Sequence, residues 1–120
     1  MPGSQAQRLR ERTKRFAVEI VRFCRGLPPT VEVRRISEQL VASATSVTAN
    51  YHAACRARTR PEFIAKIGTV LEEADETGLW LDLLIESGTV NHETIAALRR
   101  EAEELTAIFA ASLRTARSRR

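Results

Sequence analysis

Residues 39–64 read QLVASATSVTANYHAACRARTRPEFI and carry the most informative helical pattern of the chain. Four apolar residues recur there at steps of three or four, which is the spacing of one face of an α-helix: Leu40, Ala44, Val47 and Tyr51. Small side chains occupy most positions between them. Because small side chains let neighbours approach closely on more than one side, we predict that this segment is a core helix.

Asn50 stands immediately before Tyr51 in this crowded segment. A buried amide that lacks a hydrogen-bond partner costs about 1 to 3 kcal/mol. No obvious nucleophile or base accompanies it in the sequence, so a catalytic role is not indicated. We interpret Asn50 as a structural residue that bridges helices.

The same periodicity extends outward into three further helices. We predict helices at about residues 5–26, 31–57, 61–87 and 92–116, followed by a basic, frayed C-terminal tail. The breaks between them carry recognisable signals: Gly26 with the Pro28 pair, the capping box that opens at Thr59, and the N-cap residues Thr30 and Asn91. Short connections between helices of this length predict an all-α, up-down-up-down antiparallel four-helix bundle, with residues 1–120 as a single domain.

The third helix has two features that predict contacts beyond its own face. Gly68 and Gly78 would each cost about 1 kcal/mol relative to alanine, so we expect another helix to approach closely at both. Its end is also apolar over more of its circumference than one bundle usually buries. We therefore predict a homo-oligomer interface there, formed by Leu79, Trp80, Leu83 and Leu84.

These motifs resemble a known family, the four-helix bundle proteins also called the 23S rRNA intervening-sequence protein family. The resemblance covers about residues 16–88. It rests on the Gln-hydrophobic start, the small-residue run ending in Ala-Asn-Tyr, the basic turn, Glu-Phe-Ile and the Glu-rich helix ending in Leu-Leu-x-Ser-Gly. The matching residues are Gln39, Ala49, Asn50, Tyr51, Arg56, Glu62, Phe63, Ile64, Glu72, Glu73, Ala74, Glu76, Leu83, Leu84, Ser87 and Gly88.

Charge is distributed unevenly along the chain. The net charge is +4, but residues 1–60 hold 12 basic against 4 acidic residues, whereas residues 61–120 hold 7 against 11. Two cysteines without a CxxC pair, and no secretory h-region, favour a reduced cytoplasmic setting. No apolar run approaches the roughly 20 residues that span a membrane.

Catalytic and metal chemistry lack their usual residues. The chain has no Glu-x-x-His pair of the kind that builds di-metal sites in helical bundles, so the acidic run near Glu72 is read as a solvated face. His52 and Cys55 lie one turn apart, but two ligands fall short of a zinc site. There is no phosphate-binding glycine loop and no recognisable triad. We predict no enzyme activity, no cofactor and no metal.

The remaining candidate is a basic surface with two clusters. They comprise Arg8, Arg10, Arg12, Lys14 and Arg15 near the start of the first helix, and Arg56, Arg58 and Arg60 near the second turn. Arginine suits forked contacts with phosphate oxygens. No aromatic residues interleave with these arginines, so binding is expected to follow the nucleic-acid backbone with low sequence specificity. The alternative left open is a solubilising surface paired with acidic groups.

The resemblance adds an expectation about assembly and partners. The related accessory protein of diversity-generating retroelements is a barrel-shaped homopentamer with a basic surface that binds nucleic acid and a reverse transcriptase. This implies a homo-oligomer, most simply a pentamer, that binds RNA or DNA as an accessory to a reverse transcriptase or an RNA process. The competing hypothesis is a protein-interaction scaffold that does not bind nucleic acid.

Overall fold

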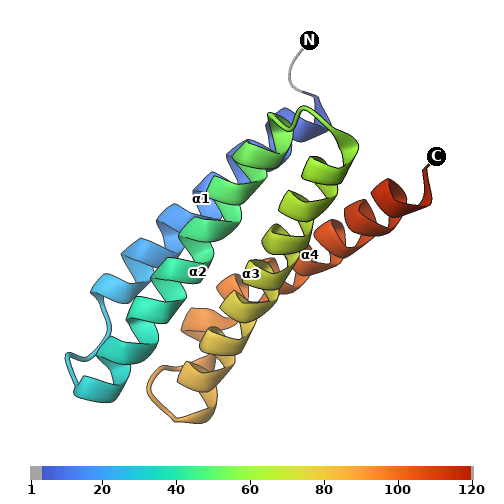
Figure 1. The fold of residues 1–120 in the computed structure, drawn as a ribbon. Helices are drawn as coiled ribbons and strands as arrows, with labels where there is room; N and C mark the ends of the chain where they lie inside the picture. The colour runs from blue at the N-terminus through green and yellow to red at the C-terminus, as the bar shows by residue number, and fades with distance from the viewer. Residues whose placement is uncertain (1–3, 120) are drawn as a thin grey trace.

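The chain folds into four α-helices arranged as antiparallel neighbours (Figure 1). The computed structural model describes residues 4–119, apart from the side chain of Thr94, and contains no strand within that range. The helices are α1 (Gln5–Arg25), α2 (Val31–Cys55), α3 (Arg60–Glu86) and α4 (His92–Ser118). The predicted all-α, four-helix fold is confirmed.

Each helix begins at a side chain that satisfies an otherwise unpaired backbone N–H group. Ser4, Thr30 and Thr59 accept a hydrogen bond from the N–H group three residues later, and Asn91 accepts one from the N–H group of Glu93. The predicted caps at Thr30, Thr59 and Asn91 are therefore confirmed.

The core lies along the central axis and receives apolar residues from all four helices. Fully buried examples are Phe16 and Ile20 of α1, Leu40 and Val47 of α2, Ile67 and Leu81 of α3, and Leu105 and Phe109 of α4. Tyr51 is buried against Phe109, with ring centroids 5.2 Å apart and planes tilted by 48°. The predicted core helix around residues 39–51 therefore packs as expected.

The end of α4 differs from its prediction. The helix continues to Ser118 instead of ending near residue 116, so the segment predicted to be a frayed tail is helical up to that point. Leu113 and Ala116 are buried, and the Arg60 guanidinium donates to the Ala116 carbonyl at 2.6 and 2.9 Å. The last turn is held by these apolar contacts and by the hydrogen bonds to the Ala116 carbonyl. Arg120, the last residue of the predicted tail, lies outside the described residues.

Only one of the two predicted glycine contacts is present. A Cβ atom on Gly78 would lie 3.5 Å from Arg99 Nη1 and 4.0 Å from the Ala102 Cβ, so α4 does pack against this position. A Cβ atom on Gly68 would meet nothing within 4 Å. The prediction for Gly68 is wrong for contacts within the chain, because no helix among the described residues comes within 4 Å of a Cβ atom at that position.

Polar contacts tie the helices together at particular levels. The Arg12 side chain of α1 donates to Glu101 and Glu104 of α4, at 2.7 Å and 2.9 Å. The buried Thr77 hydroxyl of α3 donates to the Ser43 hydroxyl of α2 at 2.9 Å. Beyond the Arg12 contact, the C-terminal part of α4 leans away from the start of α1 (Figure 1). This divergence leaves one end of the bundle open.

Candidate nucleic-acid interface

Three basic segments that are far apart in sequence meet at the same end of the bundle. They are the start of α1, the turn between α2 and α3, and the end of α4 (Figure 1). We call this region the basic end. Its arginines are Arg8, Arg10, Arg56, Arg58, Arg60, Arg114, Arg117 and Arg119. The third of these segments was not part of the site predicted from the sequence.

The basic end contains a cleft of about 1000 Å³, which we call the terminal cleft. Its wall is formed by residues of all four helices, where α4 diverges from α1. The apolar part of the lining includes Leu9, Tyr51, Phe63 and Ile108. The charged part consists of Arg10, Arg58, Arg60 and Arg119, and none of the acidic side chains between residues 4 and 119 lines the cleft. This combination gives a positive, partly apolar hollow.

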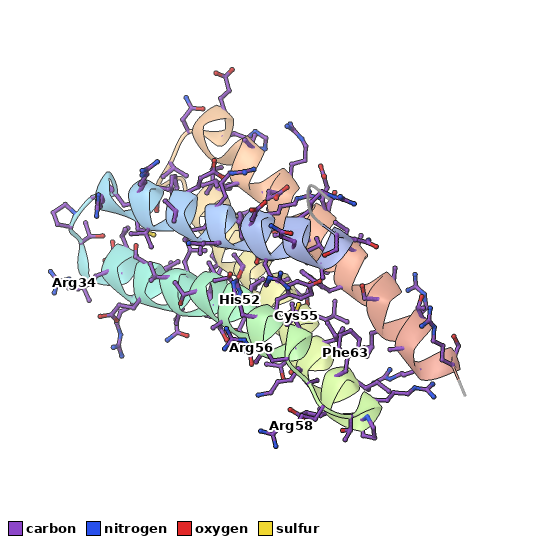
Figure 2. The ribbon with its side chains drawn as sticks, turned by 90° about the horizontal axis from the view of Figure 1, so that it is seen from above. Arg34, His52, Cys55, Arg56, Arg58 and Phe63 are labelled. Carbon is purple, nitrogen blue, oxygen red and sulfur yellow. The ribbon has the colours of Figure 1, made fainter. Side chains whose placement is uncertain are left out.

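Most of the predicted binding residues are accessible. Lys14, Arg15, Arg56 and Arg58 are exposed, as is Arg8, and Arg10 is half-buried. Figure 2 shows Arg58 projecting from the turn between α2 and α3, whereas Arg34 lies at the opposite end of α2. The two predicted clusters therefore lie on the same half of the molecule.

Arg12 and Arg60 differ from the other predicted binding residues because their guanidinium groups already have partners within the chain. The guanidinium group of Arg12 binds Glu101 through two nitrogens and Glu104 through one, and these hydrogen bonds raise its pKa. Arg60 is occupied by the Ala116 carbonyl. Both residues hold helices in place, so we remove Arg12 from the predicted phosphate contacts and assign Arg60 a structural role.

The motif residues Asn50 and Tyr51 have separate roles. The Asn50 amide donates to the Ser46 carbonyl and hydroxyl, both at 2.9 Å and both one turn earlier in α2. The prediction that Asn50 bridges helices is corrected, because both of these hydrogen bonds lie within its own helix. Burial, followed by the neighbouring Cys55, raises the pKa of Tyr51 to about 12, and the nearby Arg10 opposes this shift.

The predicted oligomer interface is only partly on the surface. Leu79 is 52% exposed and Leu83 is 39% exposed, while Trp80 is half-buried. The Trp80 indole N–H is buried and has no acceptor within the described part of the chain. Leu84 is 0% exposed and belongs to the core, so it cannot contact another copy and is removed from the predicted interface.

A second hollow lies between α3 and α4, and we call it the acidic groove. It measures about 520 Å³ and is lined by Leu79 together with Asp75, Asp82, Glu103 and Arg99. Arg99 donates to both Asp82 oxygens, at 2.6 and 3.2 Å, and lies 3.8 Å from Glu103. Arg99, the one cation that the described chain contributes to the lining, is therefore paired, which leaves the groove acidic.

Metal and membrane sites find no support in the described residues. Between residues 4 and 119, no three His, Cys, Asp or Glu side chains lie close enough together to hold a metal ion. The His52 Nδ1 atom instead lies 2.8 Å from the Thr48 carbonyl. None of the described helices combines the length and apolar character needed to cross a membrane.

Sequence reasoning missed the contribution of α4 to the basic end. The available signal was the apolar spacing of Phe109, Leu113 and Ala116, which carries the helix, and the arginines on it, up to the segment that was read as frayed. The contribution of Phe63 to the cleft had no comparable signal. It depends on the angle between α4 and α1, which no local pattern reports.

Comparisons with known proteins agree with this fold. Residues 6–111 match the family described as 23S rRNA-intervening sequence protein. A crystal structure of a protein of unknown function, from the S23 ribosomal protein family of Bacteroides thetaiotaomicron, is 28% identical in sequence. The match covers 92% of this chain and 99% of that one, with a TM-score of 0.82. Comparison with curated protein sequences finds no match.

Proposed function

This chain belongs to the 23S rRNA-intervening sequence protein family, and we propose that it is a non-enzymatic nucleic-acid-binding protein. In this proposal the basic end contacts phosphates of RNA or DNA with low sequence specificity. Copies of the chain assemble into a homo-oligomer, most simply a pentamer, so that several basic ends act together. Repetition of weak contacts within one assembly would raise the overall affinity.

The observation that carries the proposal is the meeting of three arginine-rich segments at one end of the bundle. Within residues 4–119, no ion pair neutralises Arg10, Arg56 or Arg58. Arginine side chains that are unpaired and exposed can exchange water for phosphate oxygens at little cost. By contrast, a purely solubilising surface gives no reason for these arginines to gather away from the carboxylates that pair with Arg12 and Arg99.

The assembly part of the proposal is supported by the apolar surface at the end of α3. Leu79 and Leu83 are exposed next to the half-buried Trp80. Contact with a second copy would cover both leucines and could supply an acceptor for the Trp80 indole N–H. Light scattering at micromolar concentration should give a mass several times the 13.4 kDa of one chain.

The binding experiment compares a labelled structured RNA and a random DNA duplex across a salt series. Log affinity should fall linearly with log salt concentration, because bound cations are released from the phosphates. The Arg56→Gln/Arg58→Gln variant should bind more weakly, with a salt slope smaller by about two. A matched control is Arg22→Gln/Arg34→Gln, which removes two exposed arginines outside the basic end.

Two results would contradict the proposal. The first is an absence of binding to either probe at low salt, which would leave the arginines as ordinary surface. The second is an equal loss of affinity in both double variants, which would mean that net charge, and not the basic end, governs binding. The Arg60 side chain is left intact in this design because it holds the end of α4.

The second candidate function is a protein-interaction scaffold, and the exposed Leu79 and Leu83 favour it. An accessory role to a reverse transcriptase combines the two candidates, with nucleic acid at the basic end and protein at the apolar surface. Replacing both leucines with Glu should abolish protein contacts without touching the arginines. If nucleic-acid binding is absent and only a protein partner is lost in this variant, the scaffold explanation is correct.

A further inference from the structure

The terminal cleft has an interior that phosphate contacts alone do not use. Leu9 and Tyr51 are buried at its wall, and Phe63 and Ile108 are half-buried. A phosphate group is strongly hydrated and gains nothing from apolar neighbours. A ligand that fills this cleft therefore needs an apolar or aromatic face in addition to negative charge.

The charged part of the cleft is uniformly positive. Arg10 and Arg58 lie on two sides of it, and Arg119 lies at the end of α4. None of the three forms an ion pair with a carboxylate of the described chain, residues 4–119. Because charge complementarity requires an anion, the ligand chemistry is an anionic group attached to a flat or apolar one.

The size of the cleft further narrows the range of ligands that it can bind. Its volume of about 1000 Å³ lies at the upper end of the range for small-ligand sites, roughly 300 to 1000 Å³. One nucleotide with its flanking phosphates fits such a space. A base inside a duplex cannot enter it, because that base is paired and stacked within the helix and must first be extruded.

We infer that the terminal cleft binds an unpaired nucleotide, with the base against Phe63 and the flanking phosphates on Arg10, Arg58 and Arg119. This inference rests on the proposed function and adds to it a preference for single-stranded segments and loops of nucleic acid. Stacking on an aromatic ring tolerates any base, since every base has a flat face. The cleft therefore adds affinity for unpaired strands without adding sequence specificity.

The position of Phe63 is set by the start of α3. Thr59 caps the helix, Pro61 lies in its first turn, and the Phe63 N–H donates to the Thr59 carbonyl at 3.0 Å. The adjacent Arg60 contact fixes α3 against the end of α4. The aromatic ring is thus held on a capped helix whose start is tied to α4, and Figure 2 shows Phe63 and Cys55 in the same region.

The test uses the intact protein and three labelled probes with the same number of phosphates per strand: a 15-nucleotide single strand, the same strand made abasic, and the corresponding duplex. Fluorescence anisotropy at one salt concentration should show the single strand binding about tenfold more tightly than the abasic strand. Phe63→Leu should remove most of this difference while leaving the abasic strand unaffected. The matched control is Phe23→Leu, a half-buried phenylalanine of α1 that does not line the cleft.

The two cysteines give a second readout that reports the location of the strand. Cys55 lines the terminal cleft, whereas Cys24 does not, and both are half-buried free thiols. The single strand should slow alkylation of Cys55 by a maleimide at least fivefold and leave Cys24 unchanged. The abasic strand at equal occupancy should protect Cys55 much less.

Each alternative result has a definite meaning. Equal affinity for single strand and duplex, with Cys55 unprotected, overturns the inference but leaves the proposed function standing. Failure of all three probes to bind overturns both the inference and the proposed function. Protection of Cys55 by an acidic amphipathic peptide, and not by the single strand, overturns the inference and assigns the cleft to a protein segment. If Cys55 of the free protein reacts only after dilution, a second copy of the chain occupies the cleft, and the inference is overturned.

Discussion

The terminal cleft and the acidic groove both border α4, yet they differ in whether their arginines are paired with carboxylates. In the acidic groove, Arg99 is surrounded by Asp75, Asp82 and Glu103 and is held by Asp82 at 2.6 Å. Among the described residues, the charged side chains of the terminal cleft are four arginines, of which only Arg60 has a hydrogen-bond acceptor, the Ala116 carbonyl. An arginine in the first hollow stabilises the bundle, whereas most of those in the second remain available to a ligand.

This contrast shows why counting basic residues is a poor guide to a binding site. Arg12 belongs to the most basic segment of the sequence, but its guanidinium group is occupied by Glu101 and Glu104. Arg58 has no such partner in the described chain, although the two residues look equivalent in sequence. Availability depends on which helix faces each arginine, and that is a property of the tertiary fold.

The largest expected effect comes from removing the buried ring of Phe109, which packs against Tyr51 of the terminal cleft. Phe109→Ala deletes a 0% exposed ring that packs on Tyr51, and should lower the free energy of unfolding by about 3 to 5 kcal/mol. Phe63→Ala, at the half-buried wall of the cleft, should lower the free energy of unfolding much less. Urea unfolding at fixed protein concentration measures both. Similar losses for the two variants would show that Phe63 is a core residue and not part of an open wall.

A smaller effect is expected from the surface beside the acidic groove. Leu79→Glu/Leu83→Glu places carboxylates in the proposed contact between copies, so the mass in solution should fall to that of a single chain. Affinity for nucleic acid should then fall about a hundredfold, because the avidity of the assembly is lost. Light scattering and anisotropy test this. An unchanged mass of the variant would mean that the contact between copies lies elsewhere. A monomeric wild-type protein would contradict the proposed assembly.

Arg12→Gln should separate structural arginines from binding arginines. It breaks the contacts with Glu101 and Glu104, and because Arg12 is 32% exposed the cost in unfolding free energy should be only about 1 kcal/mol. Its affinity for nucleic acid should stay within about twofold of wild type. Arg58→Gln should behave in the opposite way, with lower affinity and unchanged stability. Thermal unfolding and anisotropy on both variants give the comparison.

The smallest expected effect concerns Glu73 on the acidic side of α3. Burial, followed by Glu76 and Glu72, raises its pKa above the ordinary value, so the folded state favours the protonated form. A raised carboxyl pKa contributes stability at low pH that is lost as pH rises through the folded-state pKa. Glu73→Gln should therefore stabilise the protein by a few tenths of a kcal/mol, roughly, at pH 7. The gain should vanish at acid pH, where Glu73 is protonated in both the folded and the unfolded state, and a gain that is independent of pH would rule out titration as its cause.

The fold was largely predictable because its signals are local. The spacing of Leu40, Val47 and Tyr51 reports a buried helical face, and Thr30, Thr59 and Asn91 mark helix starts through their own side-chain hydrogen bonds. The candidate site was predictable only in part. Two of its basic segments were visible, while the arginines at the end of α4 were read as a frayed tail and were left out of the site.

The sequence by itself determined four amphipathic helices, their caps and the excess of positive charge in the first half of the chain. Those properties depend on residues within one or two helical turns of each other. Only the tertiary structure decided that Arg12 meets Glu101, that Leu84 is buried beside the exposed Leu83, and that Phe63 and Arg58 share a cleft with α4. These outcomes depend on the angles at which the helices pack. The side chains of whole interfaces set those angles together, and no single segment encodes them.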